Sequence, residues 1–177
     1  MRILLIGGSK SGKSTTAQHL CRHLASGAPM YYWATMTPRD GEDRQRVLRH
    51  IADRAGWGFQ TIERSTGLTA ALPDIDKGGA VLLDSVTAAL SEAMFGPKFD
   101  ADAAETVTAE LLAVSRHSAH FICVCDDLWR GGEDYPDWTE VYVRGLAHVC
   151  RALAARFDVV CDMAAGLPRV WKGAWPL

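Results

Sequence analysis

The chain alternates short apolar runs with longer stretches in which apolar residues recur every three or four positions. The short runs, which predict buried strands, lie at 2–6, 30–34, 80–83, 121–125 and 159–161. The periodic stretches, which predict helices, include 42–55, 101–115 and 138–157. Residues 58–62 alternate as an edge strand does, and 170–171 predict a last strand. Strands that alternate with helices favour an α/β fold with a mainly parallel sheet.

A glycine-rich segment follows the first predicted strand directly. It reads Gly7-Gly8-Ser9-Lys10-Ser11-Gly12-Lys13-Ser14 and matches the pattern G-x-x-x-x-G-K-[ST]. Gly7 and Gly12 let the backbone turn tightly, so that its N–H groups converge on phosphate oxygens. Lys13 reaches the β- and γ-phosphates, and Ser14 offers a hydroxyl to Mg²⁺. The helix that follows, with Thr15 in its first turn, directs the positive end of its dipole at the anion.

This segment predicts a site for ATP or GTP with Mg²⁺, within a three-layer P-loop NTPase-type α/β fold. The alternative is a glycine-rich turn that binds nothing. It is disfavoured because strand, loop, Lys-Ser pair and helix occur together.

Acidic residues end two of the predicted strands. Asp84 follows the run 80–83, and ligands of open α/β sheets bind beyond the carboxyl ends of the strands. Asp84 is therefore predicted to hold Mg²⁺ together with Ser14. It could also, or instead, be the N-cap of the helix that begins at Ser85-Val86. The pair Asp126-Asp127 ends the next strand, before a predicted long loop over 128–136 that is either functional or a mobile surface connection.

The predicted helix over 42–55 carries a histidine between two arginines. Arg46, His50 and Arg54 are four residues apart, so they share one stripe of the helix. Taken alone, the pattern is more typical of a solvated helix face with an incidental histidine.

Together, these motifs resemble the bifunctional adenosylcobinamide kinase/adenosylcobinamide-phosphate guanylyltransferase family, and the resemblance covers most of the chain. Besides the phosphate loop it rests on Ala34-Thr35, Arg46-Val47-Leu48-Arg49-His50, Arg54, Thr61-Ile62-Glu63, and Ala165-Gly166-Leu167-Pro168 followed by Lys172. The chain departs from the family pattern at Asp84-Ser85 in place of Glu-Cys, at Ala55 in place of Pro, and at Asp126-Asp127-Leu128-Trp129 in place of Asn-Glu-x-Gly. It also has Val143-Arg144 in place of Arg-Asp and Cys150-Arg151 in place of Asn-Gln.

The resemblance implies two reactions at one nucleotide site: phosphorylation of adenosylcobinamide by ATP or GTP, and transfer of GMP from GTP through a histidine-bound intermediate. His50 would be the nucleophile, since a neutral imidazole can attack the α-phosphorus while flanking cations offset the developing charge. Arg46, Arg54, Glu63 and Asp84 would join the phosphate loop in binding nucleotide. The resemblance also implies a corrinoid substrate and a homotrimer.

Composition narrows the remaining classes. At 177 residues the chain is expected to form one nucleotide-binding domain, 1–177, and its net charge of −2 without a Lys/Arg block disfavours nucleic-acid partners. Its apolar runs are too short to span a bilayer, and no signal peptide is recognised, so we expect the cytoplasm. The cysteines are odd in number, without a C-x-x-C pair, and are predicted to be buried thiols: Cys21, Cys123, Cys125, Cys150 and Cys161.

Two other functions are compatible with the motifs. A P-loop kinase for another small alcohol would keep Lys13, Ser14 and Asp84 but would leave His50 incidental. A non-catalytic regulatory subunit would bind ATP or GTP without turnover. Labelling by GTP that carries its label at the α-phosphate separates both from the guanylyltransferase.

Overall fold

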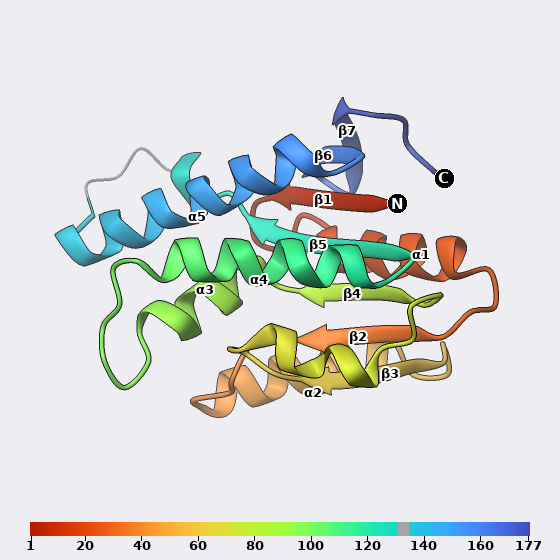
Figure 1. The fold of residues 1–177 in the computed structure, drawn as a ribbon, viewed down its shortest axis with the longest axis horizontal. Helices are drawn as coiled ribbons and strands as arrows, with labels where there is room; N and C mark the ends of the chain where they lie inside the picture. The colour runs from red at the N-terminus through yellow and green to blue at the C-terminus, as the bar shows by residue number, and fades with distance from the viewer. Residues whose placement is uncertain (131–134) are drawn as a thin grey trace.

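The computed structural model describes residues 1–130 and 135–177, apart from the side chains of Glu42, Arg46 and Asp53. A seven-stranded sheet in the order β3-β2-β4-β5-β1-β6-β7 forms its middle layer (Figure 1). The strands are β1 (Arg2–Gly7), β2 (Met30–Ala34), β3 (Phe59–Glu63), β4 (Ala80–Asp84), β5 (His120–Asp126), β6 (Val159–Ala164) and β7 (Leu167–Lys172). Strands β1 to β6 pair in parallel, and β7 runs antiparallel to β6. The predicted mainly parallel sheet is confirmed, with β3 at one edge.

Helices cover both faces of this sheet. They are α1 (Lys13–Ala25), α2 (Gly41–Asp53), α3 (Val86–Met94), α4 (Ala103–His117) and α5 (Asp137–Arg156). Side chains of α3, α4 and α5 pack on one face with Leu83 and Phe121, whereas α1 packs on the other with Leu82 and Ile122. Figure 1 shows α3, α4 and α5 in front of the sheet and α1 behind it. The three-layer α/β arrangement follows, because successive residues of a buried strand face opposite sides.

The elements differ from the sequence expectations mainly at their ends. The β6–β7 hairpin is longer than predicted, because its last strand is largely exposed and lacks an apolar run. Two 3₁₀ helices, η1 (Leu68–Asp74) and η2 (Leu128–Arg130), were not predicted. The turn η1 buries Leu68 and Ala71 but contains Pro73, so it shows no helical period. Of the predicted loop 128–136, residues 131–134 lie outside the described part of the chain.

Candidate nucleotide and acceptor site

The carboxyl ends of β1, β2, β4 and β5 meet at one edge of the sheet. The register places Gly7 of β1 beside Asp126 of β5, and Ala34 of β2 beside Asp84 of β4. Two cavities, of about 510 Å³ and 330 Å³, open at this edge. We call the first, which is lined by residues 9–15, Arg49, His50, Asp84, Ser85, Val124 and Asp126, the phosphate-loop cavity.

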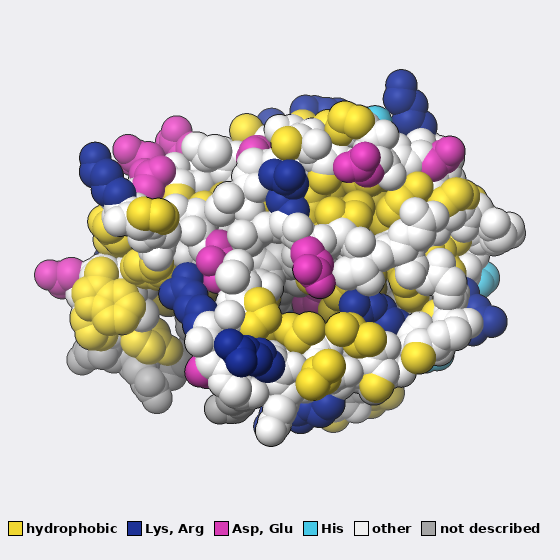
Figure 2. Space-filling model, turned by 90° about the horizontal axis from the view of Figure 1, so that it is seen from below, with side chains coloured by type: hydrophobic (Ala, Val, Ile, Leu, Met, Phe, Trp, Pro, Cys, Tyr) yellow, Lys and Arg dark blue, Asp and Glu magenta, His cyan; other side chains and the backbone are white. Residues whose placement is uncertain are grey.

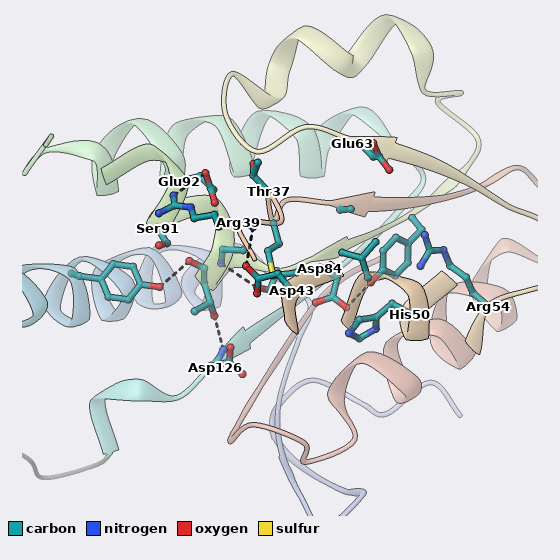
Figure 3. A pocket seen from close by; sticks show the side chains of 18 residues that line it. Thr37, Arg39, Asp43, His50, Arg54, Glu63, Asp84, Ser91, Glu92 and Asp126 are labelled. Carbon is teal, nitrogen blue, oxygen red and sulfur yellow. Dashed lines mark hydrogen bonds and ion pairs between the residues drawn. The ribbon is translucent and has the colours of Figure 1, made fainter. Parts of the chain in front are cut away.

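The second cavity, which we call the side cavity, shares four of these residues: His50, Asp84, Ser85 and Asp126. Its remaining lining comes from β2 and the segment after it, α2, Arg54, β3, α3 and Tyr142 of α5 (Figure 3).

The phosphate loop is held in place by its own backbone and by the β6–β7 turn. The N–H of Ser11 donates to the carbonyl of Gly8 at 3.2 Å, and the N–H of Gly166 donates to the carbonyl of Ser11 at 3.0 Å. A side chain at position 7 would run into the carbonyl of Met163. Gly12 has φ 93° and lies so close to the turn that an added Cβ would be 3.2 Å from the Cα of Gly166. Both glycines are thus required by close backbone approach, as well as by the turn itself.

Lys13 folds back onto the loop in this structure. Its Nζ donates to the carbonyls of Gly7 at 2.8 Å and Gly8 at 2.6 Å, and lies 2.9 Å from Oδ1 of Asp126. The residue is only 7% exposed, so its charge is fully partnered inside the protein. Asp126 was not predicted as a site residue. Its position at the end of a predicted buried strand was the signal that could have identified it; that this strand lies beside β1 comes from the structure.

Asp84 lines both cavities and is oriented by a tyrosine. The hydroxyl of Tyr32 donates to Oδ2 of Asp84 at 2.8 Å. The alternative that Asp84 caps α3 is wrong: the N-cap is Ser85, whose Oγ accepts from the N–H of Ala88 at 3.1 Å. The cap lies one residue later because Ser85 has the extended backbone that an N-cap needs, while Asp84 still belongs to β4.

The donor set fits Mg²⁺. Ser14 and Asp84 line the phosphate-loop cavity, and among the described residues no group of three or more His, Cys, Asp or Glu could form a metal centre. Mg²⁺ in phosphoryl-transfer sites is held by one or two carboxylates together with substrate phosphates and water, so a sparse protein set is what it requires. The buried thiols are not competitors, because burial raises the pKa of Cys21 to about 12 and raises those of Cys123 and Cys125.

His50 comes from α2 and contributes to the walls of both cavities. The helix begins at an N-cap, Asp40, whose side chain accepts from the N–H of Asp43 at 2.8 Å. Figure 3 shows His50 close to Asp84, with Arg54 following on the same segment. The third member of the predicted stripe, Arg46, has a side chain outside the described part of the structure.

Arg54 is buried although it is charged. Its guanidinium lies 3.9 Å from the centroid of the Tyr32 ring, and its Nη2 is 3.3 Å from Oγ1 of Thr61. Nη1 has no hydrogen-bond partner among the residues that the structure describes. Arg54 as a residue belongs to the lining of the side cavity. By contrast, Glu63 is exposed and lies apart from the other labelled side chains in Figure 3.

Polar side chains that sequence reasoning missed connect the cavity walls. The hydroxyl of Tyr142 donates to the carbonyl of Thr87 at 2.8 Å, and Oγ1 of Thr87 accepts from the N–H of Asp126 at 2.8 Å. Burial raises the pKa of Tyr142, which keeps this hydroxyl a donor. At the rim, Arg39 pairs with Glu92 at 3.2 Å. Thr87, Glu92 and Tyr142 stand in ordinary helix patterns and Arg39 lies in the segment between β2 and α2, so their spacing gave no signal.

Comparisons with known proteins agree with this geometry. The family model described as cobinamide kinase / cobinamide phosphate guanyltransferase matches residues 3–170. The bifunctional adenosylcobalamin biosynthesis protein CobP of Pseudomonas aeruginosa is 30% identical over 179 residues, which cover 98% of each chain.

Among solved structures, the flagellar accessory protein FlaH of Methanocaldococcus jannaschii superposes with a TM-score of 0.53 at 12% identity, covering 97% of this chain and 78% of that one. An ATPase domain also superposes with a TM-score of 0.53, at 8% identity, covering 91% of this chain and 68% of that one. These two likenesses concern the fold alone, which is that of P-loop ATPases.

Proposed function

We propose that the chain, which belongs to the cobinamide kinase / cobinamide phosphate guanyltransferase family, carries out the kinase and the guanylyltransferase reaction at the junction of the two cavities. The second reaction passes through a GMP adduct of His50. Because it belongs to this family, the protein is an enzyme of cobalamin biosynthesis. The observation that carries the residue assignment is the position of His50, which lines the phosphate-loop cavity and the side cavity together.

In the kinase reaction, the triphosphate of ATP or GTP lies in the phosphate-loop cavity, cradled by the N–H groups of residues 7–15. Lys13 leaves Asp126 and binds the β- and γ-phosphates. Ser14 and Asp84 would hold Mg²⁺, which would supply positive charge to offset that of the phosphates. The acceptor, adenosylcobinamide, enters through the side cavity. Its hydroxyl oxygen attacks the γ-phosphorus and loses its proton to water. The bond between the γ-phosphorus and the β-phosphate oxygen breaks, and ADP or GDP leaves.

In the guanylyltransferase reaction, an imidazole nitrogen of His50 attacks the α-phosphorus of GTP, and the bond to pyrophosphate breaks. A phosphate oxygen of adenosylcobinamide phosphate then attacks the same phosphorus and releases His50. Arg54 supports this assignment, because it belongs to the wall of the side cavity and its guanidinium carries a positive charge that favours a phosphate there. Arg46 and Glu63 remain nucleotide-binding candidates from the sequence.

The deciding experiment is incubation with α-labelled GTP and Mg²⁺, followed by denaturing electrophoresis. The wild-type protein should take up label that is stable in alkali and labile in acid, as a phosphorus–nitrogen bond to histidine is. His50→Asn should take up none, yet should keep most of its kinase activity, because phosphoryl transfer uses Lys13, Ser14 and Asp84 without a protein nucleophile.

His148→Asn is the matched control, because His148 is exposed on α5. Equal labelling of His50→Asn and His148→Asn would remove the proposed role of His50. Kinase activity without any labelling of the wild-type protein would point to a kinase for a small alcohol alone, and nucleotide binding without turnover to a regulatory subunit.

We further propose that the protein is a cytoplasmic homotrimer. In the described part of the chain, no helix is long and apolar enough to cross a bilayer.

A further inference from the structure

A group of aromatic side chains lies where α3 ends and α5 begins. The ring of Phe95 is its centre, with centroids 5.7 Å from those of Trp138 and Tyr142 and 5.8 Å from that of Phe99. We call these four residues the aromatic cluster. Phe95 packs against the buried core, whereas Phe99 is 48% and Trp138 58% exposed. Figure 2 shows hydrophobic side chains at the left end of the molecule, where Figure 1 places the beginning of α5.

The aromatic cluster is continuous with the side cavity. Tyr142 belongs to both, since its ring contacts Phe95 while the residue lines the cavity and its hydroxyl donates to the carbonyl of Thr87. Helix α3 makes the same connection, because Ser91 and Glu92 line the cavity and Phe95 follows one turn later. Tyr142 and α3 therefore link the lining of the side cavity to the exposed aromatic rings.

The size of the side cavity limits what part of the acceptor it can hold. Its volume of about 330 Å³ is at the lower end of pockets that enclose small ligands. Cobinamide consists of a corrin macrocycle with amide side chains and a slender arm that ends in the reacting hydroxyl. The arm fits such a cavity, but the macrocycle does not. If the hydroxyl reaches the junction beside His50, the macrocycle must rest outside the mouth of the cavity.

We propose that the aromatic cluster binds the corrin macrocycle while the side cavity receives the arm, an inference that rests on the proposed function. Exposed Trp and Phe rings bury the apolar edge of a large ligand at little cost in side-chain entropy. The Arg39–Glu92 pair at the rim offers donors and acceptors that suit the amide side chains of the macrocycle. An uncharged aromatic platform beside a polar rim matches this uncharged, amide-bearing periphery.

The test measures binding directly, with dicyanocobinamide as the probe and equilibrium dialysis read by corrinoid absorbance. Truncating an exposed aromatic ring of the cluster should raise the Kd by about tenfold in Trp138→Ala, and further in the double variant with Phe99→Ala. Trp171→Ala is the matched control: Trp171 is 59% exposed, similar to Trp138, but lies on β7 at the edge of the sheet. Its Kd should equal that of the wild type.

Three results would overturn the proposal: wild-type Kd in the folded double variant, no binding of the probe by the wild-type protein, or a change of oligomeric state with an unchanged Kd. The last would assign the aromatic cluster to a contact with a second copy of the chain. The Kd for GTP and the labelling from α-labelled GTP should be normal in the double variant. Failure of that labelling in the wild-type protein concerns the proposed function instead, so the two can be told apart.

Discussion

The phosphate loop and α2 line the same cavity, but they are held there by different means. The loop is fixed through its backbone, with the N–H of Gly166 bonded to Ser11 and that of Asp127 bonded to Gly7 at 3.3 Å. Helix α2 instead leaves Leu48 63% and Ile51 44% exposed. Just beyond its end, Arg54 lies over the ring of Tyr32. One wall of the site is thus built by main-chain geometry and the other depends on side-chain contacts.

This difference shows which residues determine the geometry of each part of the site. The loop needs contiguous residues, so substitutions of its side chains should remove ligand contacts and leave the fold intact. The position of His50 depends on residues far away in sequence, so substitutions there should act through geometry as well as through lost charge. Four variants test this difference between the loop and α2.

Lys13→Ala should have the largest effect and should leave the fold intact. The residue supplies several charge-assisted hydrogen bonds to phosphates, and loss of such a donor costs about 10²–10³-fold in turnover. Calorimetric titration with GTP and kinase assays measure this, with the exposed Lys77→Ala as control. Normal nucleotide binding in a folded Lys13→Ala protein would contradict the assignment of the loop.

Asp84→Asn should reduce Mg²⁺-dependent turnover by about 100-fold, with little change in melting temperature. Asparagine can still accept from Tyr32, and the cap of α3 is Ser85, so stability has no reason to fall. Activity against Mg²⁺ concentration measures the effect, with the exposed Asp74→Asn as control. Reduced stability with normal metal dependence would instead make Asp84 a structural residue.

Arg54→Lys tests whether α2 is held by a planar group. An ammonium cannot stack as a guanidinium does, so we expect a loss of about 1 kcal/mol in the free energy of unfolding and weaker GMP transfer than phosphoryl transfer. Arg44→Lys, on an exposed face of the same helix, should change neither. Denaturant titration and the two activity assays provide the readout. Equal losses in both activities would show that Arg54 does not act specifically on His50.

Asp126→Asn should have the smallest effect, and in the opposite direction. Lys13 must leave Asp126 to bind phosphates, and the pair is partly buried, with side chains 8% and 25% exposed. Removing an attraction of about 1 kcal/mol should lower the Kd for GTP by about fivefold. Asp127→Asn removes the same charge from the same turn but not from Lys13. A Kd that rises in Asp126→Asn would mean that Asp126 itself helps to bind the nucleotide.

The sheet and the phosphate loop could be predicted because their signals are local. Residues 80–83 form a continuous apolar run, as buried parallel strands do, and the loop pattern is one contiguous segment. The position of β3 at an edge of the sheet could also be predicted, because residues 58–62 alternate in polarity. The strand order was not, because pairing of β1 with β5 and β6 is set by packing between residues far apart in the chain.

The candidate site was predicted in part, for the same reason. Lys13 and Ser14 were named from the loop pattern, Asp84 from its place at the end of a buried strand, and His50 from the family resemblance. All four line one cavity. The partners that orient them were missed: Tyr32 stands in a buried strand and Thr87 in an ordinary helix, so each looks like core until the fold brings it to Asp84 or Asp126. The cap of α3 was misplaced by one residue because Asp and Ser are both good N-caps and only the backbone decides between them.

The brace between the β6–β7 turn and the phosphate loop has a consequence for synthesis on the ribosome. The loop is synthesised before β5 and β6, its neighbours through β1 in the sheet, and before the turn at Gly166 that is bonded to it. A nascent chain therefore cannot assemble the braced nucleotide site until residue 166 has left the exit tunnel. Ribosome-bound fragments that stop before residue 159 should fail to retain GTP, because they lack both β6 and the turn that braces the loop.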